Sequence, residues 1–273
     1  MAYAYAGEGS LDYFPCHYGG SRLLFRGPQR DLALPYVAAL GGTETYGKFI
    51  PRPWPDLAEA ETGWRMVNLG CVNAGPDAWL SDPAAMRVAA GARAAVVQVM
   101  GAANLSNRHY AVHPRRNDRF VRANPPLRAL FPEVDFTHFH FTGHLLGTLR
   151  AVSPRRFATL ADDLRAAWMG RMRSLIAELR VPVTLLWVGR ALPPALADPG
   201  GPEPFLIDAG MIAALRPLVA GYVEVTYHGD PEGASLDGMA FAEMERPAAE
   251  GLPGPEVHAK VAAALAPILD KLR

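Results

Sequence analysis

Three short apolar runs in the first half of the chain each end in a loop of small residues, and this pattern constrains the fold more than any other. The runs span residues 36–41, 64–70 and 94–100. Buried parallel strands have such continuous apolar sequences, and the loops that follow them meet at the carboxyl edge of the sheet. We therefore expect a ligand site at that edge.

The second half of the chain continues the alternation of strands and helices. Residues 108–156 interrupt it and predict an inserted lid or subdomain, and residues 1–35 predict an extended N-terminal lead-in. The whole chain, 1–273, is predicted to be a single α/β domain with about five parallel strands between layers of helices. The later elements are predicted as helices at 157–179, 208–220 and 255–272 and as strands at 182–189 and 222–228.

The charge balance restricts the classes of partner that the protein can be expected to bind. The 27 basic residues equal the 27 acidic ones, which argues against a nucleic-acid or membrane-surface binder. Neither a signal peptide nor a membrane-spanning apolar run is visible, so we expect a cytoplasmic protein. Cys16 and Cys71 have neither metal-site nor disulfide spacing. We expect no cofactor and no metal, and the sequence predicts no oligomeric state.

The loop after the first run carries the strongest chemical signal. Its sequence is Gly41-Gly42-Thr43-Glu44, at the expected junction between a strand and a helix. A hydroxyl group presented there can act as a nucleophile if a base lies within hydrogen-bond reach. The alternative is that Thr43 is the N-cap of the helix or a ligand-binding hydroxyl. Glu44 is a candidate acid or base, or else a solvated carboxylate in the first helical turn.

The loops after the three runs resemble the conserved blocks of the SGNH/GDSL hydrolase superfamily. Gly41–Gly47 is similar to the nucleophile block, with Thr43 at the serine position and Gly42 in place of the usual aspartate. Residues 68–75, which include Gly70 and Asn73, are similar to the second block, and 101–104, which end at Asn104, to the third. More closely, the whole chain resembles an uncharacterised alphaproteobacterial family with a Gly-Gly-Ser/Thr-Glu-Thr turn.

The resemblance implies a flavodoxin-like three-layer α/β/α sandwich and an ester-cleaving site. Thr43 would attack, while Gly70, Asn104 and the Thr43 amide would hold the oxyanion. Asn107 is a weaker substitute for Asn104.

The resemblance also implies a catalytic histidine near the C-terminus of the domain. The family has Asp-x-x-His there, and the C-terminal part of this chain has no such pair. His258 is one candidate for the base, with a structural contact as the alternative, and His228 at the end of the last strand is the other candidate. If Pro255–His258 is instead aligned with the family's trailing Pro-Glu-Gly-His, the catalytic position falls on Leu252.

Two further clusters lie in the predicted insertion. Arg115, Arg116 and Arg119 could bind an anionic group, or they could form salt bridges that fix the insertion. His138 and His140 would share a face if they lay on a strand, which is a possible pair of metal ligands. The neighbouring phenylalanines favour a half-buried strand instead.

The sequence thus supports two classes of function. The first is an SGNH-like hydrolase or O-acyltransferase that uses Thr43 on an ester of a polar small molecule or glycan. The second is a fold that has lost its catalytic groups and binds an anionic or glycan ligand. A transferase of another group, such as sulfate, is a third interpretation. No phosphate-binding glycine motif of the nucleotide-binding kinds is present.

Overall fold

Five parallel strands form the central sheet of the protein. The computed structural model describes residues 11–227 and 236–272. The sheet has the order β2–β1–β3–β6–β7, and all neighbouring strands run parallel. This is the flavodoxin-like order, so the predicted fold class is confirmed. The strands are β1 (Val37–Leu40), β2 (Met66–Asn68), β3 (Ala94–Gln98), β6 (Val183–Gly189) and β7 (Gly221–Thr226).

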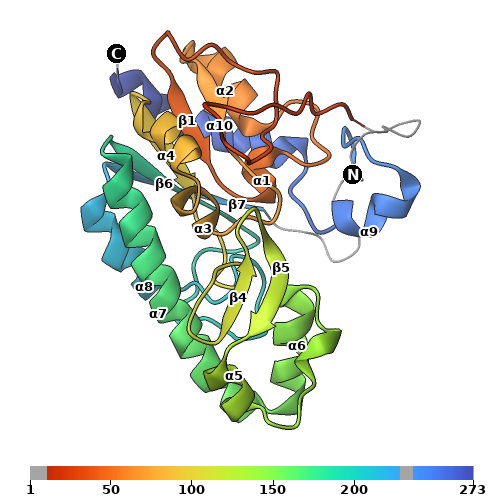
Figure 1. Cartoon of the computed structure of the whole chain (residues 1–273). Helices are drawn as coiled ribbons and strands as arrows, with labels where there is room; N and C mark the ends of the chain where they lie inside the picture. Colours follow the sequence, from red (N-terminus) through yellow and green to blue (C-terminus); the bar gives the residue numbers. More distant parts are fainter. Residues whose placement is uncertain (1–10, 228–235, 273) are drawn as a thin grey trace.

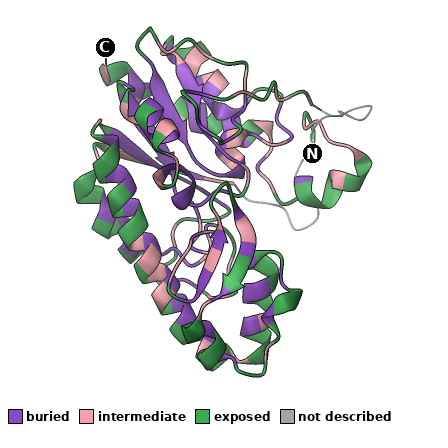
Figure 2. Cartoon of the chain, in the orientation of Figure 1, coloured by how far each residue is buried: buried purple, intermediate pink, exposed green. Residues whose placement is uncertain are grey.

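Alternate side chains of the sheet face two separate layers of helices (Figure 1). On one face, Leu40 and Val97 pack with α3 (Asp77–Leu80), α4 (Pro83–Ala90), α7 (Pro154–Leu179) and α8 (Ala209–Leu215). On the other, Ala39 and Val96 pack with α2 (Trp54–Thr62) and α10 (Pro255–Leu269). The strands β1, β2, β3 and β6 are buried on both sides, as Figure 2 shows in purple, whereas the edge strand β7 is only partly buried. The result is a three-layer α/β/α sandwich.

Several helices begin where a side chain or a proline favours it. Asp82 accepts hydrogen bonds from the backbone N–H groups of Ala84 and Ala85 at the start of α4. Asp208 caps α8 in the same way. Pro55 lies in the first turn of α2, where its missing N–H has no cost.

The inserted segment projects from the carboxyl edge of the sheet, at the bottom of Figure 1. It contains an antiparallel hairpin, β4 (Tyr110–His113) and β5 (Arg116–Ala123), followed by α5 (Pro125–Leu130) and α6 (Thr142–Val152). The half-buried strand expected around His138 is not formed. Phe136–His138 is instead a 3-10 helix, η1, because Asp135 caps the turn through the Thr137 N–H.

The remaining described segments are short. They are α1 (Thr43–Tyr46), η2 (Arg216–Leu218), η3 (Glu243–Glu245), α9 (Arg246–Ala249) and η4 (Asp270–Leu272). Before the sheet, Tyr18, Leu23 and Phe25 of the lead-in are buried in the core. Among the helices of the described ranges, none is both long and apolar enough to cross a membrane.

Candidate functional site

A cavity of about 330 Å³ opens at the carboxyl edge of the sheet. Its walls come from the segments that follow all five strands, and it lies where the chain order reverses between β1 and β3. Ligands of flavodoxin-like proteins bind at this position because loops from the two halves of the sheet diverge there. The polar residues that line it are Thr43, Glu44, Asn73, Gln98, Asn104, Arg190, Glu203 and Tyr227.

Thr43 lies at the wall of this cavity and is 8% exposed. Its hydroxyl donates a hydrogen bond to Asn73 Oδ1 at 3.1 Å and accepts one from the Asn73 backbone N–H at 3.0 Å. The N-cap of α1 is Gly42, so the interpretation of Thr43 as the N-cap is wrong. Thr43 is the first residue inside this short helix, and its side chain joins the β1 loop to the β2 loop.

Gln98 organises the Thr43 turn, and the sequence analysis did not identify it. Its side-chain oxygen accepts hydrogen bonds from the N–H groups of Gly42 and Thr45 and from the Thr45 hydroxyl. Its side-chain nitrogen donates to Glu44 Oε2 at 2.7 Å. Gly41 has to be glycine because an added Cβ would overlap the Gln98 and Thr45 side chains. A single glutamine inside the apolar run of β3 was the available signal.

Asn104 lines the cavity, whereas Asn107 does not. The Asn104 amide donates to the backbone oxygen of Asn73 at 2.9 Å, and its oxygen accepts from the Thr142 hydroxyl at 2.6 Å. The Asn107 side chain instead accepts from the N–H groups of His109 and Tyr110 and stabilises a turn.

Gly70 does not line the cavity either. Its N–H donates to Asn68 Oδ1 at 2.9 Å, and a Cβ at this position would overlap the backbone of Thr45 and Tyr46. The glycine is required for close packing behind the Thr43 turn. Its N–H is therefore not available to an oxyanion, contrary to the expectation from the resemblance.

Two carboxylates share the cavity. Glu44 follows Thr43, and Glu203 comes from the loop between β6 and α8, where it accepts a hydrogen bond from the Phe205 N–H at 2.8 Å. Desolvation raises the pKa of Glu203, and the nearby Glu44 charge raises it further. Desolvation, with the same two carboxylates contributing, raises the pKa of Tyr227 to about 12. Glu203 was missed, although an acidic residue between two prolines marked it.

None of the seven histidines in the described ranges lines the cavity. His258 is 2% exposed, and its Nδ1 accepts a hydrogen bond from the Trp54 N–H at 3.0 Å. Desolvation and the nearby Arg26 lower its pKa to about 3, so it is neutral and structural. Leu252, the alternative position for the family's histidine, does line the cavity. His228 lies outside the described residues.

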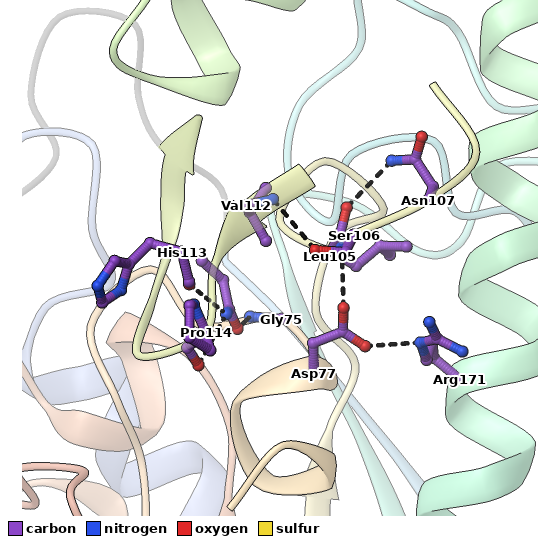
Figure 3. Close-up of polar contacts among 10 residues, drawn as sticks. Gly75, Asp77, Leu105, Ser106, Asn107, Val112, His113, Pro114 and Arg171 are labelled. Carbon is purple, nitrogen blue, oxygen red and sulfur yellow. Dashed lines mark hydrogen bonds and ion pairs between the residues drawn. The ribbon is translucent and has the colours of Figure 1, made fainter. Parts of the chain in front are cut away.

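The arginine run lies on the hairpin beside the cavity, not in its wall. Figure 3 shows how buried polar groups attach this hairpin to the sheet domain: Asn117 accepts from the Gly75 N–H at 3.0 Å and donates to the backbone oxygen of His113. Below it, Asp77 accepts from the Ser106 N–H and from Arg171. In the part of the chain that is described, no ion pair involves Arg115, Arg116 or Arg119, so the salt-bridge alternative is not supported.

Comparison with known proteins assigns the family. A family model described as a domain of unknown function, DUF6473, matches residues 1–273. The chain belongs to the DUF6473 family. A search of curated proteins gave no match. Among solved structures, the lipase Lip_vut3 from a goat rumen metagenome matches with a TM-score of 0.39 and 10% identity, over 85% of this chain and 96% of the lipase chain.

That degree of structural similarity carries no functional argument, so the chemistry of this DUF6473 protein has to come from its own cavity. The cavity combines the Thr43 hydroxyl, the Tyr227 phenol, two carboxylates, three amides and a guanidinium. Pairs of titratable groups in unlike environments are typical of acid–base catalysis. Within the residues that the structure describes, no group of three or more metal-ligating side chains is found.

Proposed function

We propose that this DUF6473 protein is a divergent SGNH-like hydrolase or O-acyltransferase that acts on an ester of a polar, glycan-like molecule. One observation carries the proposal: Thr43, Asn104 and the carboxylates of Glu44 and Glu203 line a single cavity at the switch point of the sheet. A cavity of about 330 Å³ suits one or two sugar-sized groups. The carboxylates and amides are suitable partners for hydroxyl groups of the substrate.

In this proposal Thr43 Oγ1 attacks the carbonyl carbon of the ester, and the Glu203 carboxylate accepts the hydroxyl proton. The bond to the alcohol then breaks, and the alcohol leaves with the proton from Glu203. Water, or an acceptor alcohol, attacks the acyl-threonine and gives its proton to Glu203, which returns it to Thr43. A carboxyl group with a raised pKa is a better base than an ordinary glutamate.

The surroundings of Thr43 set two requirements for this route. The hydroxyl hydrogen has to leave Asn73 Oδ1, which it contacts in the structure without substrate. The developing oxyanion needs donors, and we assign this role to the second amide hydrogen of Asn104 and the backbone N–H of Thr43. That N–H makes no hydrogen bond within the described residues.

The test is acid release from a panel of acetylated sugars and simple aryl esters. Thr43→Ala and Glu203→Gln should each lower kcat/KM by about 100-fold or more, since each removes a group that acts in the transition state. Thr43→Ser keeps the hydroxyl and should retain turnover, and Glu178→Gln, on the exposed side of α7, is the matched control. If Thr43→Ala retains full turnover while Glu203→Gln loses it, water and not Thr43 is the nucleophile.

The pH profile gives a second check. The ionised Glu203 is the active form, so kcat/KM should rise with pH through the pKa of Glu203. Since that pKa is raised, the rise should occur at higher pH than for an ordinary glutamate. The rise should be absent from the residual activity of Glu203→Gln.

A second candidate function is binding without turnover. Leu252 occupies the cavity position that one alignment gives to the catalytic histidine, and the Thr43 hydroxyl is already bonded on both sides. In this case no ester in the panel is cleaved by the wild-type protein. The same sugars should still bind, with Thr43→Ala changing the affinity by less than about threefold, whereas the loss of a cavity carboxylate weakens binding.

A further inference from the structure

The hairpin beside the cavity is strongly basic, although the whole chain has no net charge. Residues 108–128, which span the hairpin and its flanks, contain six arginines and one aspartate, against 27 basic and 27 acidic residues in the whole chain. Arg108 pairs with Asp163 at 2.8 Å, and Arg128 is bonded to a backbone oxygen. The guanidinium groups of Arg115, Arg116 and Arg119, which we call the arginine cluster, have no carboxylate partner among the described residues.

Hydrogen bonds fix the strand that carries the arginine cluster beside one wall of the cavity. Asp118 lies between Arg116 and Arg119 in the sequence and accepts a hydrogen bond from the side-chain amide of Asn73, a cavity residue, at 3.2 Å. Asn117, the residue before Asp118, is buried and accepts a hydrogen bond from the Gly75 N–H. Consecutive residues of β5 are therefore fixed to the loop that carries one wall of the cavity. The cluster cannot move away from that wall without breaking both anchors.

The other end of the cluster is connected to the cavity by a second route. The Arg119 guanidinium lies 4.6 Å from the centre of the Phe141 ring, which is 43% exposed. The next residue, Thr142, bonds Asn104, a cavity residue, at 2.6 Å and also the backbone oxygen of Asp118. The Phe141 ring and the Arg119 guanidinium therefore lie next to a residue that is bonded to the cavity wall.

We propose that the arginine cluster binds carboxylate groups of an anionic glycan chain whose esterified unit enters the cavity. Guanidinium groups bind carboxylates through paired hydrogen bonds, and the exposed Phe141 ring offers an apolar face to a sugar. This deepens the proposed function and rests on it for the identity of the cavity substrate. The ligand expected from guanidinium groups beside an aromatic ring is a polyanion with a sugar backbone.

The experiment measures binding and not turnover. Polygalacturonate, with neutral pullulan as the uncharged probe, is titrated into the full-length protein by calorimetry at fixed ionic strength. The hairpin variant R115Q/R116Q/R119Q is compared with R87Q/R155Q/R173Q, whose arginines are exposed on α4 and α7. Both variants lose three positive charges, so a difference between them reports position and not net charge. Melting temperatures show whether each variant is folded.

We expect the hairpin variant to bind polygalacturonate about tenfold or more weakly than the wild type, and the control variant to stay within about twofold. Equal losses in both variants, or no preference of the wild type for polygalacturonate over pullulan, would overturn the proposal. So would equal or tighter binding of a single-stranded DNA of matched charge, because the surface would then be one for nucleic acid.

The outcomes separate this inference from the catalytic proposal. Polygalacturonate carries no ester, so its binding reports the hairpin surface and not the acyl-transfer step at Thr43. If no ester is ever cleaved but the hairpin variant alone loses the polyanion, the surface stands and the hydrolase proposal fails. If esters are cleaved and the hairpin variant binds polygalacturonate normally, the hydrolase proposal stands and the proposed binding surface fails.

Discussion

At the cavity edge and in the α2–α10 layer, a buried polar side chain accepts hydrogen bonds from the backbone, but with different consequences. At the edge, Gln98 accepts from Gly42 and Thr45, and in the helix layer His258 accepts from Trp54. Gln98 also holds Glu44, which faces the cavity, whereas His258 is enclosed and neutral. The comparison shows that burial and backbone hydrogen bonds alone do not make a side chain part of a site: Gln98 contributes to the cavity because it also holds a carboxylate at the opening.

The largest effect is expected from Gln98→Leu. This change leaves the Gly42 N–H, the Thr45 N–H and the Thr45 hydroxyl without acceptors, at about 1–3 kcal/mol each. The free energy of unfolding, measured with urea, should fall by at least about 3 kcal/mol, and ester turnover should be lost. Gln29→Leu, at an exposed site, should change the free energy of unfolding by less than about 0.5 kcal/mol. Similar results for the two variants would mean that Gln98 does not organise the turn.

A smaller effect, visible only in acid, is expected from His258→Gln. The pKa of His258 is lowered from 6.5 to about 3, so between these values the unfolded chain binds a proton that the folded chain does not. Stability is therefore lost as pH falls from 6.5 towards 3, and at pH 5 the loss from this group is about 2 kcal/mol.

Glutamine keeps an acceptor for the Trp54 N–H and removes the titration. The difference in unfolding free energy between pH 7 and pH 5 should shrink by about 2 kcal/mol in His258→Gln and stay unchanged in His140→Gln, whose imidazole is exposed. An unchanged pH dependence in both variants would show that His258 is accessible to protons in the folded state, which reopens its role as a base.

The smallest effect on stability is expected from Gly101→Ala. A Cβ at Gly101 would overlap Glu203 Oε2 and the backbone nitrogen of Phe205, so the carboxylate and the loop that carries it have to shift. Unfolding free energy should fall by about 1 kcal/mol, because a small shift of this loop relieves most of the overlap. Ester turnover should drop with the displaced base. Gly143→Ala, where nothing lies within 4 Å of an added Cβ, should alter neither quantity, and a normal rate for Gly101→Ala would count against Glu203 as the base.

The sequence predicted the sheet more fully than the site. Continuous apolar runs identified the strands because a parallel strand is buried on both faces, and the glycine loops predicted the edge at which the cavity opens. The sequence motifs selected Thr43, Glu44 and Asn104, which line the cavity. They also selected Gly70, Asn107 and His258, which the structure uses for packing and turns. Motif spacing cannot distinguish a donor already used inside the protein from one that faces a ligand.

The amino-acid sequence by itself determined the strand–helix alternation, the five-stranded parallel sheet and the edge at which its loops converge, because burial and backbone preference act over a few residues. Only the tertiary structure decided which polar groups share one cavity. Glu203 approaches from a loop more than 150 residues after Glu44, and the arginine hairpin is joined to Asn73 by side-chain contacts between distant segments. Such pairings depend on how loops that are distant in the sequence pack together, so no local sequence pattern can predict them.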